Sequence, residues 1–236
     1  MNKNSVGGII FIGEKHNIQT SLESRGTLKM HSNDKRLDVI QEVINCSIGK
    51  STSSLNKTYS SHLLIQIPKI QINGNSYSDQ SFTIPKNEYF SCITMDFTRD
   101  IQGRSHIILL KKNVLQMITN LLHVSLETPG FDNFMTSAMV EIGTMLIHSI
   151  IGSFCKILHS NVEFSIPDYF EGTGEILSHW NEHSAQFIQI EAQTHFILES
   201  VRLSGFIFLF MDLNRFDDLV EKLKYLSNSH IALQKI

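Results

Sequence analysis

The sequence has 236 residues, of which 42% are hydrophobic and 18% charged, with a formal net charge of −3 and a pI near 6.4. This length can bury a continuous core, and the composition is that of an ordinary globular protein, which excludes a disordered or fibrous chain. The slight negative charge disfavours nucleic acid or an anionic membrane as partner, because it provides no positive field to attract either.

Residues 1–34 are polar except for the apolar run 9–12, and we interpret them as an appended irregular arm of unknown role with at most one strand. From Asp34 onward, apolar residues recur at helical spacing and weaken near Gly49, which predicts a helix and then a second short helix to about Thr58. The remaining first-half predictions are strands at 62–72, 89–97 and 105–110, and a helix at 113–123. Pro68 indicates an edge position or a bulge in the first of these strands.

The second half begins with the longest helical pattern, about 132–158, which is apolar around most of its circumference and therefore expected in the core. A polar stretch extends from the end of the next strand to residue 184. The other predictions in this half are strands at 162–166, 185–198 and 205–211, and a final helix at 214–226. The order of helix, strands and helix is thus repeated.

Residue spacing supports an internal duplication. One offset of 99 residues relates four positions of the first half to four of the second: Asp38, Glu42, Asn45 and Pro68 to Ser137, Glu141, Thr144 and Pro167. An offset near 102 relates Gly103 and its following helix to Gly205 and the last helix. We therefore predict one domain over 35–236 built from pseudo-repeats at about 35–123 and 131–226.

Each half carries a polar stripe on an apolar helix. Asp38, Glu42 and Asn45 stand at i, i+4 and i+7, which places them on one helix face. The long helix repeats the stripe with the side chains Ser137, Glu141, Thr144 and His148. A solvated face would explain one such stripe, but two helices with the same register favour a functional surface.

The stripe and its downstream proline resemble the motif of the CheC/CheX/FliY family of chemotaxis phosphatases. That motif is an acidic residue or serine, three residues, Glu, two residues, Asn, twenty-two residues and Pro, and the first half satisfies it fully. The resemblance covers about residues 35–226. It implies an α+β fold in which two pseudo-symmetric halves share one antiparallel sheet and the long motif helices pack along it.

The resemblance also implies an activity, the hydrolysis of the aspartyl phosphate of a CheY-like response-regulator receiver. Asn45 would orient the attacking water, as a glutamine does in GTPases, because an amide offers both a donor and an acceptor. Glu42 would bind a receiver lysine and fix the docked geometry. Mg²⁺ is expected in the receiver's own site, and no cofactor is expected on this chain.

The second copy departs from the motif. Thr144 stands where the amide belongs, and its shorter side chain lacks two-point hydrogen bonding, so we expect Glu141 and Thr144 to form an impaired or purely binding site. Misplacing the water could cost roughly 10²-fold in rate. Asp38 and Ser137 are interpreted as capping or supporting residues, and Pro68 and Pro167 as structural because proline has no titratable group.

The rival interpretation is a noncatalytic adaptor similar to flagellar switch proteins, which binds a phosphorylated receiver or another chemotaxis protein. The sequence leaves open which receiver is the substrate, whether a CheD-like protein also binds, and the oligomeric state. Exposure of Glu42 and Asn45 would discriminate, because residues turned into the core cannot act on a partner.

Metal and redox sites are disfavoured. Residues 179–183 spell HxxEH, a zinc-protease pattern that needs a helix and a further ligand, whereas the flanking sequence predicts a polar loop. The cysteines, Cys46, Cys92 and Cys155, are odd in number and form no CxxC pair, which fits a reducing compartment. With no basic segment leading into a long apolar stretch at the amino terminus, we expect a cytoplasmic protein without a membrane partner.

Overall fold

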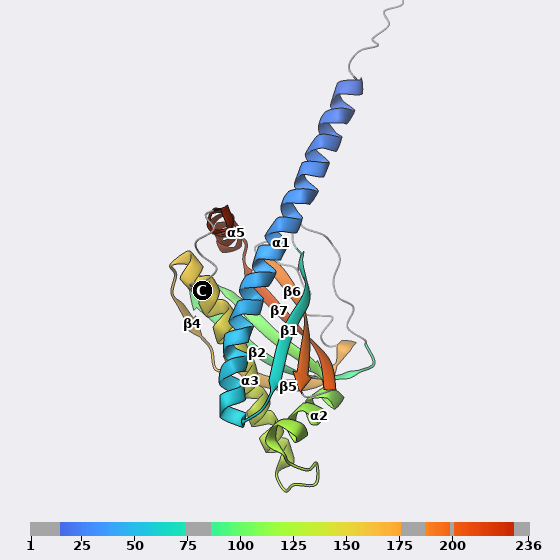
Figure 1. The fold of residues 1–236 in the computed structure, drawn as a ribbon, viewed down its shortest axis with the longest axis vertical. Helices are drawn as coiled ribbons and strands as arrows, with labels where there is room; N and C mark the ends of the chain where they lie inside the picture. The colour runs from blue at the N-terminus through green and yellow to red at the C-terminus, as the bar shows by residue number, and fades with distance from the viewer. Residues whose placement is uncertain (1–14, 74–85, 176–186, 199–200, 229–236) are drawn as a thin grey trace, which may run out of the picture. The chain divides into compact units, whose positions relative to one another are not determined.

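The helix that carries Glu42 is longer than the sequence predicts. A computed structural model of the chain describes residues 15–73, 86–175, 187–198 and 201–228 (Figure 1). In it, α1 spans Lys15–Tyr59 without a break. The chain divides into two compact units, Met1–Arg36 and Leu37–Ile236, and within the first of them residues 15–36 are helical.

Two predictions about this region are therefore wrong. Residues 15–34 are helical and not an irregular arm; they contain one glycine and no proline, but their polar composition gives no apolar period from which a helix could be recognised. Gly49 does not end the helix, because buried side chains on both sides, Ile44, Ile48 and Leu55, anchor it to the core. The predicted strand at 9–12 lies outside the described residues.

The second unit alternates helices with antiparallel strands in the predicted order. The elements after α1 are β1 (Leu63–Asn73), β2 (Tyr89–Arg99), β3 (Gly103–Leu110), α2 (Lys111–Leu122), α3 (Phe131–Leu158), β4 (Val162–Phe164), β5 (Asp168–Thr173), β6 (Phe187–Leu198), β7 (Val201–Asp212) and α5 (Leu213–Asn228). Strand β5 falls in the stretch that was described as polar and for which no strand was predicted. It pairs with β2, a tertiary contact that its six residues do not reveal alone.

The sheet has the symmetry of the repeat. Its seven strands run in the order β1-β6-β7-β3-β2-β4, with β5 also paired to β2. Exchanging the halves relates β1 to β4 and β5, β2 to β6, and β3 to β7, which reproduces the same order around the central β3–β7 pair. The predicted α+β class with two pseudo-symmetric halves in one antiparallel sheet is confirmed.

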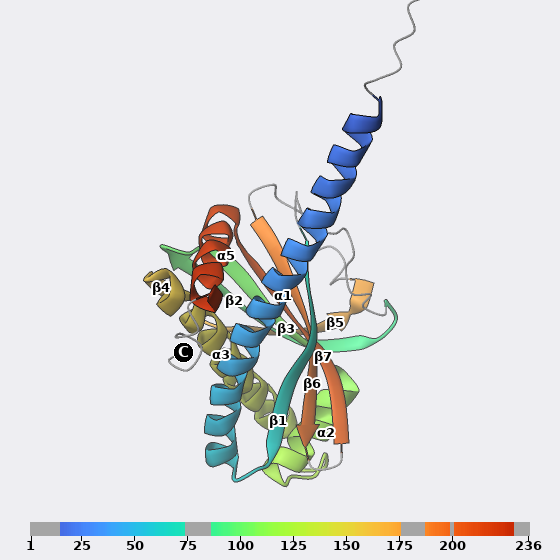
Figure 2. The ribbon, with the colours of Figure 1, turned by 45° about the horizontal axis from the view of Figure 1, so that its top comes forward.

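The helices of this unit cover one face of the sheet. Figures 1 and 2 show α1 and α3 side by side across that face, with α5 and α2 toward opposite ends. Alternate strand residues such as Ile93, Ile190 and Leu209 point into the main core beneath them. Residues of the opposite strand parity, Phe90, Cys92, Ile108 and Phe208, form a smaller cluster on the other face.

Helix α3 is the central core helix. By length and composition it could cross a membrane, but 61% of its most apolar window is buried within the protein. At Gly143 the helix approaches β2 so closely that an added Cβ would lie 2.8 Å from the side chain of Ile93. Its apolar circumference thus reflects packing against the sheet on one side and against α1 on another.

Candidate functional site

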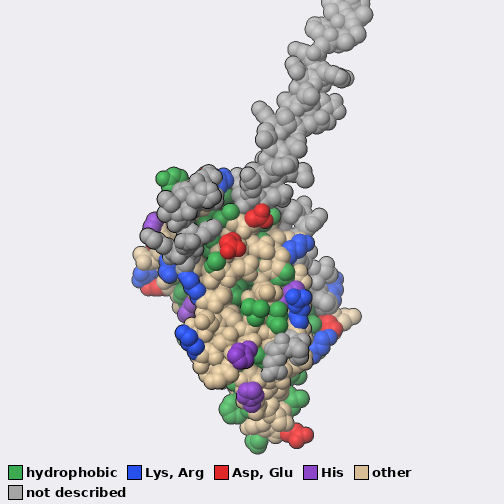
Figure 3. All heavy atoms as spheres, viewed as in Figure 1, with side chains coloured by type: hydrophobic (Ala, Val, Ile, Leu, Met, Phe, Trp, Pro, Cys, Tyr) green, Lys and Arg blue, Asp and Glu red, His purple; other side chains and the backbone are tan. Residues whose placement is uncertain are grey.

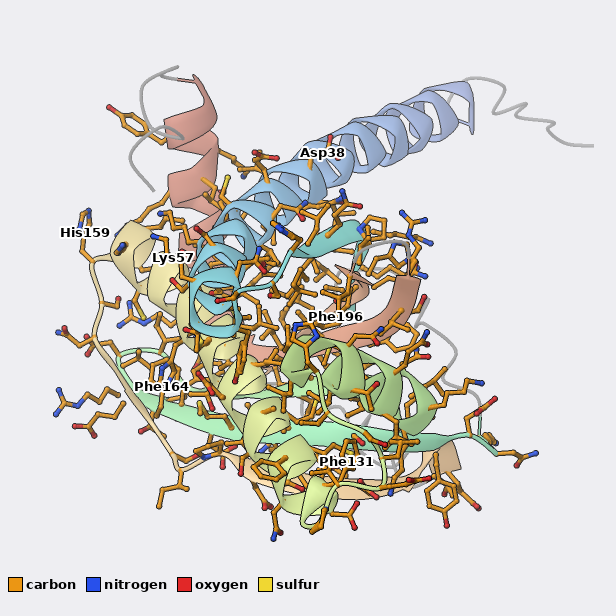
Figure 4. The ribbon with its side chains drawn as sticks, turned by 60° about the horizontal axis from the view of Figure 1, so that its bottom comes forward. Asp38, Lys57, Phe131, His159, Phe164 and Phe196 are labelled. Carbon is orange, nitrogen blue, oxygen red and sulfur yellow. The ribbon has the colours of Figure 1, made fainter. Side chains whose placement is uncertain are left out.

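The polar stripe of the first copy lies on the outward side of α1. Asp38 and Glu42 are exposed and Asn45 is half-buried, whereas Val43 and Ile44 on the other side of the helix are fully buried. Figure 4 shows Asp38 pointing away from α1, and Figure 3 shows acidic side chains over the same helix on the surface. The helix therefore presents two carboxylates to solvent and buries its apolar face.

The Asn45 amide is bound to the backbone of β1. The N–H of Ile67 donates to Asn45 Oδ1 at 3.0 Å, and Asn45 Nδ2 donates to the carbonyl of Ile67 at 3.4 Å. The same carbonyl accepts a shorter bond of 2.9 Å from Gln41 Nε2, one turn earlier on α1. Asn45 thus bonds both the N–H and the carbonyl of Ile67, and Gln41 gives that carbonyl a second donor.

The bulge in β1 explains this contact. β1 is an edge strand, and its register against β6 shifts between Gln66 and Lys69, the interval that contains Ile67 and Pro68. The prediction of an edge position or bulge at Pro68 is confirmed. Because proline has no N–H and the ladder is interrupted, Ile67 needs another partner. In this chain the spacing from Asn45 to Pro68 therefore places the Asn45 amide at the bulge. We call the paired hydrogen bonds between Asn45 and Ile67 the clamp.

Glu42 has a weak partner on its own helix. Cys46 Sγ donates to Glu42 Oε1 at 3.5 Å, and burial together with Glu42 raises the pKa of that thiol. A thiol is a weak donor, so the exposed carboxylate can still accept a stronger bond from an ammonium group. Accepting such a bond is the role that was expected for Glu42 from the sequence resemblance.

The equivalent glutamate on α3 has a strong partner. Tyr59, the last residue of α1, donates its hydroxyl to Glu141 Oε2 at 2.5 Å. Partial burial and this carboxylate raise the pKa of Tyr59, so the phenol stays protonated as the donor. The residue that corresponds to Tyr59 in the second copy is Leu158, 99 positions later, which has no hydroxyl for Glu42. The two glutamates are therefore in different environments.

Among the residues that the structure describes, the clamp of the first copy has no equivalent in the second. Thr144 is half-buried, and within the described part of the chain its hydroxyl has no hydrogen-bond partner. The carbonyl of Ile166, the residue before Pro167, accepts a hydrogen bond of 3.0 Å from Ser165 Oγ. The Ser165 hydroxyl in turn accepts a bond of 3.0 Å from the N–H of Asp96. Ser137 on the same stripe is exposed.

His148 completes the second stripe in a packing role. Its ring lies 4.1 Å from the ring of Phe164, centroid to centroid, and partial burial lowers its pKa. Phe164 belongs to β4, and Figure 4 shows it beside α3. The ring of this histidine therefore packs against the short strand, while the residue itself stays exposed on the polar stripe of α3.

Serines outside the motif join the two motif helices. Ser47 Oγ lies 2.7 Å from Ser153 Oγ, and Ser149 Oγ donates to the Ser47 carbonyl at 2.6 Å. Ser51 Oγ donates to the Met145 carbonyl at 3.1 Å. These contacts run in opposite directions along the two helices, so α1 and α3 are antiparallel and their stripes are related by the pseudo-two-fold axis. The recurrence of small side chains on both helices is the sequence signal from which this contact could have been predicted.

Metal binding has no support in the described part of the chain, where no group of three or more His, Cys, Asp or Glu side chains could hold an ion. The HxxEH pattern at 179–183 lies outside the described residues. The three cysteines are free, with Cys92 and Cys155 buried and Cys46 half-buried.

Comparison with known proteins identifies the fold. No model of a known protein family matches the sequence, and no curated protein resembles it. Among solved structures, Thermotoga maritima FliY superimposes with a TM-score of 0.57 at 15% identity, covering 81% of this chain and 96% of FliY. FliM from its H. pylori complex with SpeE gives 0.54 at 10% identity, covering 84% of this chain and 97% of that one.

The chain has the CheC/CheX/FliY fold. The FliM middle domain of Vibrio alginolyticus agrees, with a TM-score of 0.50 at 15% identity over 78% of this chain and 99% of that one. The resemblance found in the sequence is thus confirmed at the level of the fold. These likenesses do not assign the motif residues a role, because the identities are too low.

Proposed function

We propose that the chain binds a phosphorylated CheY-like receiver through the outward side of α1 and hydrolyses its aspartyl phosphate. The observation that carries the proposal is the position of Glu42, exposed and one turn before Asn45 on a helix of this fold. Glu42 would bind a receiver lysine, and Asn45 would align the attacking water. The receiver's own Mg²⁺ supplies charge stabilisation, so this chain needs no cofactor.

Catalysis would require Asn45 to leave Ile67. Gln41 can keep the Ile67 carbonyl bonded while the amide swings out, but the Ile67 N–H loses its acceptor. Breaking one such bond costs about 1 kcal/mol, less if water replaces it at the partly exposed bulge. This is small against the binding free energy of a docked receiver, so the clamp slows but does not forbid the reaction.

The decay of a phosphorylated receiver tests the proposal. With Mg²⁺ present, decay is measured alone and with wild type, Asn45→Ala and Glu141→Ala. We expect acceleration by wild type and Glu141→Ala, and roughly a 10²-fold loss in Asn45→Ala. Gln41→Ala is the matched control, because it weakens the same clamp without removing the motif amide. Equal losses in Gln41→Ala and Asn45→Ala would mean that the amide acts only through folding.

A second candidate function is a noncatalytic adaptor that binds the receiver without hydrolysis. The observation that favours it is the engagement of Asn45 by both backbone groups of Ile67. In that case the activated receiver would bind the α1 face through Glu42, and its phosphate would decay at the same rate with and without the chain. Unchanged decay with every cognate receiver, together with measurable binding, would identify the adaptor.

Either function requires a cytoplasmic location and a protein partner. A CheD-like partner remains a proposal; it would be tested by adding such a protein to the decay assay and measuring whether the rate changes. Nucleic-acid and membrane partners form no part of the proposed function.

A further inference from the structure

The two copies of the motif differ at a residue outside the motif. Tyr59 reaches from the end of α1 to the Glu141 carboxylate of α3, with a hydroxyl-to-oxygen distance of 2.5 Å. A hydrogen bond to an ionised group is stronger than one between neutral groups. An incoming ammonium group must compete with this phenol for Glu141, whereas at Glu42 it competes with a weak thiol donor.

The antiparallel packing of α1 and α3 shows why only one of the two glutamates has a hydroxyl donor from the other helix. Pseudo-symmetry would bring position 158 of α3 to Glu42 as it brings position 59 of α1 to Glu141, since the two positions are 99 residues apart. Position 158 is a buried leucine, which cannot donate. Both glutamates of the duplicated fold are exposed, but Glu141 already accepts a phenol hydrogen bond at Oε2, whereas Glu42 accepts only from a thiol.

We propose that Tyr59 restricts the chain to a single receiver-binding face by occupying Glu141 on α3. This inference rests on the proposed function and specifies its stoichiometry: one receiver per chain, bound at Glu42. Thr144 removes the amide from the second face, and Tyr59 removes its anchor. Freeing Glu141 creates a second face that binds a receiver lysine but lacks the amide for hydrolysis.

Calorimetric titration with a receiver activated by beryllofluoride and Mg²⁺ tests the stoichiometry. Wild type is expected to bind one receiver, Glu42→Gln to bind about tenfold or more weakly, and Glu141→Gln to bind as wild type does. Tyr59→Phe keeps the ring and removes the hydroxyl, and we expect it to bind a second, weaker receiver that is lost again in Tyr59→Phe/Glu141→Gln. The Tyr59→Phe protein should show no gain in phosphatase rate.

A second measurement needs no partner. Carbodiimide coupling of an amine to exposed carboxylates, quantified by peptide mass spectrometry, compares Glu42 with Glu141 in the same molecule. We expect Glu141 to react about fivefold more slowly in wild type and at a rate similar to Glu42 in Tyr59→Phe. Equal rates in wild type, or no change in the variant, would show that Tyr59 does not occupy Glu141 and overturn the inference whatever the receiver does.

The two assays separate the possible failures. Two receivers on wild type, or one that is lost in Glu141→Gln, overturns the single-face inference while receiver binding stands. No binding by any variant overturns the proposed function and, with it, the stoichiometry, even if the labelling shows Glu141 protected. A single receiver on Tyr59→Phe with Glu141 fully reactive also overturns the inference.

Discussion

The amide of Asn45 and the backbone of Ile67 form a two-point contact between α1 and the bulge of β1. Its bonds are 3.0 Å from the Ile67 N–H to Oδ1 and 3.4 Å from Nδ2 to the Ile67 carbonyl. The asparagine that we propose to be catalytic is therefore also a structural residue. A loss of activity at this position can have either cause, and the predictions below separate them.

Asn45→Ala should reduce the free energy of unfolding by about 1–2 kcal/mol, because it leaves the N–H of Ile67 without its acceptor. Urea denaturation measures the loss. Hydrogen exchange locates it: the Ile67 amide should exchange faster, while amides of the central β3 strand keep their protection. Exchange at Ile67 that stays at the wild-type rate would show that the clamp does not persist in solution.

Thr144→Val should leave the protein as stable or raise its free energy of unfolding by up to about 1 kcal/mol. The threonine hydroxyl is buried without a hydrogen-bond partner in the described part of the chain, and valine replaces it with a methyl group of similar size. Chemical denaturation of the purified variant is the measurement. Destabilisation by more than about 1 kcal/mol would reveal a partner for the hydroxyl.

Gly143→Ala should destabilise the protein by about 1–3 kcal/mol, because the new Cβ would lie 2.8–2.9 Å from three atoms of Ile93. Gly152→Ala, on the same helix, is the matched control: its Cβ would have no neighbour within 4 Å. That control should be neutral or stabilising by up to about 1 kcal/mol through helix propensity. Similar effects at both glycines would contradict the close approach of α3 to β2.

Stability should fall with acid because of His106. Burial, and then the charge of Arg104, lower the pKa of this histidine to about 3, and its Nδ1 lies 2.8 Å from Thr94 Oγ1. The unfolded state takes up a proton near pH 6.5 and the folded state only near 3, so the stabilisation is complete above 6.5 and is lost as the pH falls between these values.

The measurement is the free energy of unfolding as a function of pH, compared with His106→Gln. The contribution of His106 should fall by about 1.4 kcal/mol per pH unit below pH 6. The variant should lack this component and retain the shallower acid dependence of groups such as Asp96, whose pKa is lowered by Arg104. Parallel curves for the two proteins would show that His106 titrates normally.

Periodicity was sufficient for most of the fold because the second unit follows simple burial patterns. The strand at 62–72 alternates and the helix at 132–158 is apolar nearly all round, and both form as expected. The helix over residues 15–34 was not predicted, because a polar helix has no apolar stripe from which it can be recognised. Strand β5 was not predicted, because it is specified by pairing with β2 and not by its own alternation.

The sequence by itself determined the duplication, the motif faces and the bulge at Pro68, because spacing along a helix and the missing N–H of proline are local properties. Only the tertiary structure decided what each motif side chain touches. Asn45 meets Ile67, and Glu141 meets Tyr59 across 82 positions of sequence. Such contacts depend on how the helices pack on one another and on the sheet, and local spacing within one element does not specify which distant side chain will be its neighbour.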